Sequence, residues 1–90
     1  MDFNHLLNQY AKLLHLSLSN EEEADAKSRL YSLMKTELLD ERTHPRLRIK
    51  PEEKYYIAIK RVLRGELSQN DQLSLIQLYT HTLDTIKSSK

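Results

Sequence analysis

The chain has 90 residues, which is the length of one small domain, and its single Gly and two Pro are too few for the tight turns of a compact β domain. It holds no Cys, which excludes disulfides, thiolate catalysis and Cys-based zinc sites. The net charge of +1 conceals a basic segment, because residues 42–64 carry eight Lys and Arg against two Glu, a net +6. No apolar run approaches the ~20 residues of a transmembrane helix and no signal peptide is visible, so we expect a cytoplasmic protein.

The first predicted helix covers residues 2–17. Apolar side chains recur there at spacings of three and four, from Phe3 to Leu14, which places them on one face. Asp2 can accept hydrogen bonds from the free N–H groups of the first turn.

The second predicted helix covers residues 20–41. Ser19 and Glu22 have the spacing of a capping box, and further acidic residues follow where the helix dipole favours negative charge. Its inward face is expected to hold Ala26, Leu30, Leu33, Met34, Glu37 and Leu38. The helix should fade before Pro45, because the residue that precedes a proline avoids the α region.

Residues 42–50 form a predicted linker. Leu47 and Ile49 alternate with Arg46, Arg48 and Lys50, and this period of two indicates an extended segment. We expect the two apolar side chains to lie on the body of the protein and the three cations to lie in water.

The third predicted helix covers residues 51–64. Pro51 suits its first position, and Gly65 is expected to end it in the left-handed conformation. Apolar residues cover more than one of its faces, so we expect it to be the central helix.

The fourth predicted helix covers residues 69–87, with Ser68 and Asp71 as a second capping box. Four helices with short connections predict an all-α fold, a single domain of residues 1–90 in the form of an antiparallel four-helix bundle.

Catalytic and metal-binding patterns are missing from the sequence. The four His residues include no pair at i,i+4, no Gly-rich loop can cradle a phosphate, and no G-x-S-x-G motif occurs. We therefore expect no enzymatic activity, no catalytic residue, no metal, no cofactor and no small-molecule substrate.

The basic segment predicts an anionic partner. The candidate binding residues are Arg42, Arg46, Arg48, Lys50 and Lys54. Nucleic acid, anionic lipid headgroups and an acidic protein patch all fit this charge, and so does a solvated face without a partner. The acidic first 41 residues also permit a homodimer. Tyr55 and Tyr56 follow the linker and are candidate interface residues.

A helix-turn-helix is one form that nucleic-acid binding can take. The third and fourth helices could form it, with Gln69, Asn70, Gln72 and Gln77 reading base edges. However, the fourth helix has no Lys or Arg before Lys87, and Asp71 would face phosphates.

Two family resemblances complete the sequence analysis. Residues 6–14, LLNQYAKLL, and residues 62–68, VLRGELS, followed by Leu78-Tyr79-Thr80, resemble the class II bacteriocin immunity proteins of the enterocin A and pediocin-like group. That resemblance implies a four-helix bundle that protects its host from a bacteriocin, acting from the cytosolic side near a membrane receptor complex. Residues 65–79 also resemble the small nucleoid-associated regulators of the haemolysin-modulating type.

The sequence therefore predicts a protein that acts by binding another macromolecule. The first expectation is a bacteriocin immunity protein. The alternatives are a small DNA-associated regulator that uses residues 42–64, and a general protein–protein adaptor or inhibitor.

Overall fold

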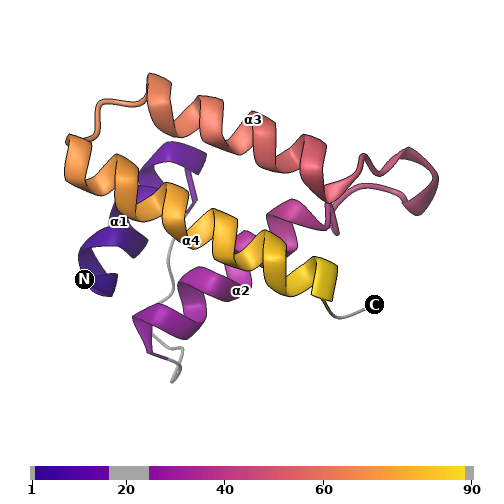
Figure 1. Ribbon diagram of the computed structural model, residues 1–90, viewed down its shortest axis with the longest axis horizontal. Helices are drawn as coiled ribbons and strands as arrows, with labels where there is room; N and C mark the ends of the chain where they lie inside the picture. Colours follow the sequence, from indigo (N-terminus) through magenta and orange to yellow (C-terminus); the bar gives the residue numbers. More distant parts are fainter. Residues whose placement is uncertain (1, 17–24, 89–90) are drawn as a thin grey trace.

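The computed structural model describes residues 2–16 and 25–88, and all the regular secondary structure within them is helical (Figure 1). The helices are α1 (Phe3–Leu14), α2 (Ala26–Leu38), α3 (Pro51–Arg64) and α4 (Gln69–Ser88), with a short 3₁₀ turn, η1 (Pro45–Leu47), between α2 and α3. The all-α class predicted from the sequence is confirmed. None of the helices in these ranges is long and apolar enough to cross a membrane.

The four helices pack so that α2 and α4 each contact all three others. In Figure 1 α3 and α4 run in opposite directions and are joined by a short loop, whereas α1 and α2 cross behind α4. The antiparallel arrangement of all four helices stays a prediction. The expectation that the third helix is central is wrong, because α3 buries only Ala58 and Val62 and leaves apolar side chains in solvent.

The hydrophobic core lies between α4 and the other three helices. Every helix contributes apolar side chains at helical spacing, and burying them removes their surface from water, which is the main force that holds the helices together. The largest fully buried side chains are Tyr10, Leu30, Met34, Leu38, Val62, Leu75 and Tyr79. These seven fully buried side chains belong to one continuous hydrophobic core in the described part of the chain.

The helix starts follow the capping rules. Asp2 accepts a hydrogen bond from His5 N at 3.2 Å, and Ser68 Oγ accepts one from Asp71 N at 3.2 Å, as predicted. The second helix begins at Ala26 rather than near residue 20, because Asp25 is extended and caps Ser28 N at 2.8 Å. The capping box predicted at Ser19 lies outside the described residues.

The ends of α1 and α2 are Schellman motifs built without glycine. His15 and Asp40 both adopt left-handed conformations with φ of 54°. In each motif the next residue donates its N–H back across five residues, from Leu16 to Ala11 O at 2.9 Å and from Glu41 to Thr36 O at 3.2 Å. Both helices therefore end before the positions predicted from the sequence.

The prediction that Gly65 is left-handed is wrong. Its φ of −72° and ψ of 164° are extended, and this conformation ends α3, while the Gly65 N–H still donates to Arg61 O and Val62 O. A Cβ atom at this position would lie 2.6 Å from Leu13 Cδ2. The glycine is thus explained by the close approach of α1 to the end of α3.

Candidate functional site

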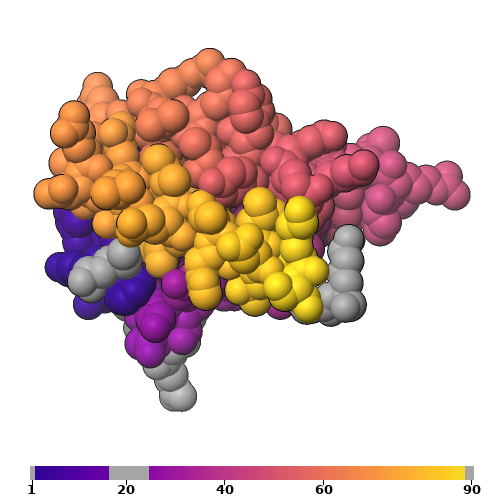
Figure 2. All heavy atoms as spheres, viewed as in Figure 1, coloured from indigo at the N-terminus to yellow at the C-terminus, as the bar shows by residue number. Residues whose placement is uncertain are grey.

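Residues 41–50 form most of the connection between α2 and α3, and we name them the basic loop. It carries four cations and, between Arg42 and Lys50, no carboxylate. Figure 2 shows it projecting from the body of the molecule beyond the ends of the helices. This surface is the candidate functional site.

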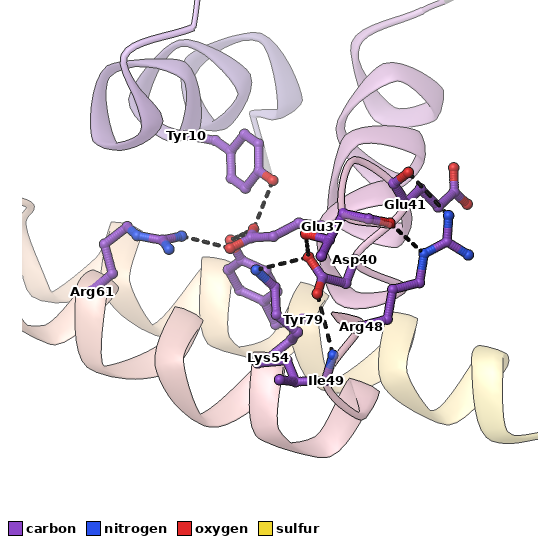
Figure 3. Close-up of polar contacts among 10 residues, drawn as sticks. Tyr10, Glu37, Asp40, Glu41, Arg48, Ile49, Lys54, Arg61 and Tyr79 are labelled. Carbon is purple, nitrogen blue, oxygen red and sulfur yellow. Dashed lines mark hydrogen bonds and ion pairs between the residues drawn. The ribbon is translucent and has the colours of Figure 1, made fainter. Parts of the chain in front are cut away.

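Asp40 holds the base of the loop (Figure 3). Its carboxylate accepts hydrogen bonds from Thr43 Oγ1 at 2.8 Å and Ile49 N at 3.3 Å, and Lys54 Nζ lies 3.8 Å away. The Thr43 hydrogen bond, helped by the Ile49 N–H and by nearby positive charge, outweighs partial burial and lowers the pKa of Asp40. One ionised side chain therefore joins both ends of the loop to α3.

Arg48 closes the interior of the loop. Its Nε donates to Thr43 O at 2.9 Å and its Nη2 donates to Glu41 O at 3.2 Å (Figure 3). Further out, Leu47 N donates to His44 O at 2.8 Å, which closes η1. Because these bonds satisfy backbone groups along its length, the loop has a defined conformation.

The structure divides the five predicted anion-binding residues into two groups. Arg42, Arg46 and Lys50 are exposed and make no ion pair within the described part of the chain. Arg48 and Lys54 instead hold the loop, through the carbonyls and the carboxylate described above. Within the described residues, the side-chain N–H donors of Arg42, Arg46 and Lys50 are therefore available to a partner.

The predicted extended linker is wrong in its central part. Pro45 begins η1, and Leu47 is 72% exposed, so it does not lie on the body of the protein as expected, whereas Ile49 is partly covered at 37% exposure. The physical reason is that Arg48 turns inward to the loop carbonyls. The Arg48 side chain therefore occupies the interior of the loop, where the period-two pattern predicted the apolar side chains.

The two candidate interface tyrosines differ in exposure. Tyr55 is half-buried and its hydroxyl lies 2.8 Å from Thr80 Oγ1, which itself donates to Ile76 O. Tyr56 is 62% exposed, and Lys60 Nζ lies 4.9 Å from its ring centroid. Only Tyr56 is therefore placed to contact a partner.

Tyr56, Lys60 and Leu63 form the α3 stripe, since they recur at helical spacing on the outward side of that helix. All three are exposed, and Leu63 is 57% exposed. This is a second candidate surface, apolar with one cation.

Sequence reasoning missed a polar cluster that links all four helices, the Glu37 cluster (Figure 3). Tyr10 and Tyr79 both donate to Glu37 Oε1, at 2.9 and 2.6 Å, and Arg61 Nη1 donates to Oε2 at 2.6 Å. The available signal was Glu37 itself, a carboxylate on the apolar face of the second helix. A buried charge needs partners, and these three supply them.

The Glu37 cluster shifts the ionisation of its members. Burial, with the negative charge of Glu37, raises the pKa of Tyr10 above its usual range, and burial chiefly raises that of Tyr79. For Arg61, burial acts against the charged form, but Glu37 outweighs it and raises the pKa. Every oxygen of Glu37 is thus engaged by a donor that stays protonated, which suits a structural clamp.

A pocket of about 200 Å³ lies beside this cluster and the loop base. Leucines form part of its wall, and its charged lining is Glu37, Asp40, Arg42, Lys54 and Arg61. The Glu37 carboxylate is already paired with Arg61, and the Asp40 carboxylate is paired with Lys54. In residues 2–16 and 25–88 no three His, Asp or Glu side chains are grouped to hold a metal ion.

Comparison with known proteins gives one family. The model of the YoyC family matches residues 1–90. The uncharacterized protein YoyC of Bacillus subtilis strain 168 is 33% identical over 85 residues, which cover 94% of this chain and 89% of that protein. No solved structure matches significantly.

Proposed function

This chain belongs to the YoyC family. We propose that it is a non-enzymatic protein that binds an anionic macromolecule through its basic loop. The observation that carries the proposal is the division of labour within the loop. Asp40 and Arg48 fix its shape, while Arg42, Arg46 and Lys50 hold their charge in solvent. In this proposal the helices act as an antiparallel bundle that supports the loop.

Fixing the loop favours binding. A loop that is already ordered loses less conformational freedom when a partner docks, so more of the attraction appears as affinity. The hydrogen bonds that Glu37 accepts from Tyr10, Tyr79 and Arg61 support a structural role for this carboxylate, because acid–base work would require one of these donors to leave.

Retention on a heparin column across a salt gradient tests the proposal. The net charge of the whole chain is only +1, so retention would report a local concentration of cations. The test variant replaces Arg42, Arg46 and Lys50 with Ala, and it should elute at lower salt with a flatter salt dependence.

The control variant replaces Lys12, Lys35 and Lys87, which are also exposed, with Ala. It removes the same three charges from other surfaces and should elute close to the wild type. Equal losses in the two variants, or a wild-type protein that passes through at low salt, would contradict the proposal.

The α3 stripe favours a second candidate function, protein–protein binding, including a homodimer. Aromatic and apolar side chains in solvent are typical of interface anchors. Leu63→Glu should then abolish self-association in analytical ultracentrifugation, whereas Leu73→Glu, at an equally exposed leucine of α4, should not. A wild type that stays monomeric at high concentration would remove the homodimer.

The immunity and DNA-regulator roles stay predictions. For a helix-turn-helix, the structure supplies one unfavourable contact: Gln72 Nε2 donates to Val62 O at 3.3 Å and is turned toward α3.

A further inference from the structure

Leu47 is the most exposed large apolar side chain in the described part of the chain, at 72%. It belongs to the basic loop, which projects from the molecule in Figure 2, and it stands between Arg46 and Arg48 in sequence. Single exposed leucines are common on protein surfaces, so Leu47 is informative only together with the cations that surround it in the loop and with Ile49, which is 37% exposed.

The outward position of Leu47 is built into the loop. Pro45 fixes the first residue of η1, the Leu47 N–H is bound to His44 O, and His44 Nδ1 accepts a hydrogen bond from Arg46 N at 3.2 Å. These bonds hold the turn, so the leucine is presented on an ordered backbone.

We propose that the basic loop docks on an anionic lipid surface, with Leu47 entering the boundary between headgroups and acyl chains. Arg42, Arg46 and Lys50 would then lie at the level of the lipid phosphates. The proposal rests on the proposed function and names the partner. Apolar side chains that enter the interface beside cations that attract anionic lipid are the combination used by peripheral membrane proteins.

Nucleic acid shares the phosphate chemistry but fits the loop less well. Phosphate contacts need only the cations, and they leave Leu47 and the partly exposed Ile49 without a role. A lipid interface uses both kinds of side chain. The acidic residues closest in sequence lie at the two ends of the loop and not between Arg42 and Lys50; they are Asp40, Glu41, Glu52 and Glu53.

Vesicle sedimentation tests the lipid partner. The probes are vesicles of equal parts phosphatidylglycerol and phosphatidylcholine, and vesicles of phosphatidylcholine alone. The wild type should bind the first and not the second. Leu47→Ser should lower the partition coefficient on the anionic vesicles about tenfold, which is the loss expected for withholding most of one leucine from the interface.

The matched control is Leu73→Ser. Leu73 is 57% exposed and lies in the first half of α4, a helix whose start is at the end of the molecule opposite the loop (Figure 1). Its substitution should leave vesicle binding unchanged. Retention of Leu47→Ser on heparin should equal that of the wild type, because a polyanion does not use the leucine. This comparison separates insertion from simple charge attraction.

A fluorescent probe tests the depth of Leu47 directly. The chain has no Trp, so Leu47→Trp and Leu73→Trp each introduce a single reporter. Anionic vesicles should shift the emission of the probe at 47 to shorter wavelength and leave the probe at 73 unchanged. Heparin and duplex DNA should shift neither.

The outcomes distinguish the two proposals. Binding to heparin or duplex DNA without binding to anionic vesicles, or vesicle binding unaffected by Leu47→Ser with no blue shift at position 47, overturns the lipid proposal and leaves the proposed function standing. Failure to bind heparin, DNA and vesicles alike overturns both.

Discussion

Replacing Glu37 with Gln should destabilise the protein by about 3 kcal/mol. The substitution keeps the shape of the side chain but removes the charge to which Tyr10, Tyr79 and Arg61 donate. Hydrogen bonds to a charged group are each worth roughly 1.5–3 kcal/mol. The amide oxygen can still accept from both tyrosines, as a weaker neutral acceptor, but the amide NH2 cannot accept from Arg61, so the guanidinium loses its partner. A domain of this size has a stability of about 5–13 kcal/mol, so the expected loss is a large fraction of the total.

Urea unfolding followed by far-ultraviolet circular dichroism measures this effect. The midpoint should fall while the slope with urea stays constant, because the same surface is exposed on unfolding. Glu66→Gln, the same chemical change at an exposed site, should stay within about 0.5 kcal/mol of the wild type. Tyr79→Phe should cost less in the Glu37→Gln background than alone. If Glu37→Gln is no more destabilising than Glu66→Gln, the assignment of Glu37 as a clamp is wrong.

Three further predictions concern stability. Burial raises the pKa of Tyr10 and Tyr79, so both stay protonated in the folded protein, whereas tyrosine in the unfolded chain ionises near pH 10. The contribution of these protonated tyrosines to the free energy of unfolding is therefore complete below pH 10. Above that pH it falls by up to roughly 1.4 kcal/mol per tyrosine per pH unit. Urea titrations at pH 8 and 11 should show a smaller alkaline loss in the Tyr10→Phe/Tyr79→Phe variant, and equal losses would refute the cause. Gly65→Ala should cost about 1 kcal/mol because its Cβ meets Leu13 Cδ2, and the cost should disappear in a Leu13→Ala background; a cost independent of Leu13 would point to the backbone. His15→Gly should increase the free energy of unfolding by about 0.5–1 kcal/mol, since glycine adopts the left-handed conformation without the Cβ penalty. The urea midpoint should rise accordingly, and a lower midpoint would contradict this account.

Much of the fold could be predicted because local chemistry determines it. Pro51, Ser68 and Asp2 mark helix starts through the backbone N–H groups that each helix leaves free, and this signal is visible in sequence. The ends of α1 and α2 could not be placed in the same way. Their left-handed residues are His15 and Asp40, and neither type announces a helix end as glycine does.

The basic segment is visible in the sequence, but the roles of the residues within it are not. Net charge indicates a basic segment, yet it cannot show that Arg48 turns to Thr43 O and Glu41 O while Leu47 turns to solvent. Those roles depend on which carbonyls the folded loop leaves unpaired. The Glu37 cluster was missed for a related reason, because its donors come from three other helices and no sequence spacing connects them.

The Glu37 cluster also bears on the order of events in folding. Its hydrogen bonds join residues 27, 24 and 42 positions apart, for Tyr10, Arg61 and Tyr79 respectively, whereas each helix closes its own bonds four residues apart. Contacts between distant positions form only after long loops have closed, so we expect the carboxylate to gain its donors after the transition state. Stopped-flow kinetics of Glu37→Gln should then show faster unfolding and a nearly unchanged refolding rate, so that the clamp governs how long the native state persists rather than how fast it is reached.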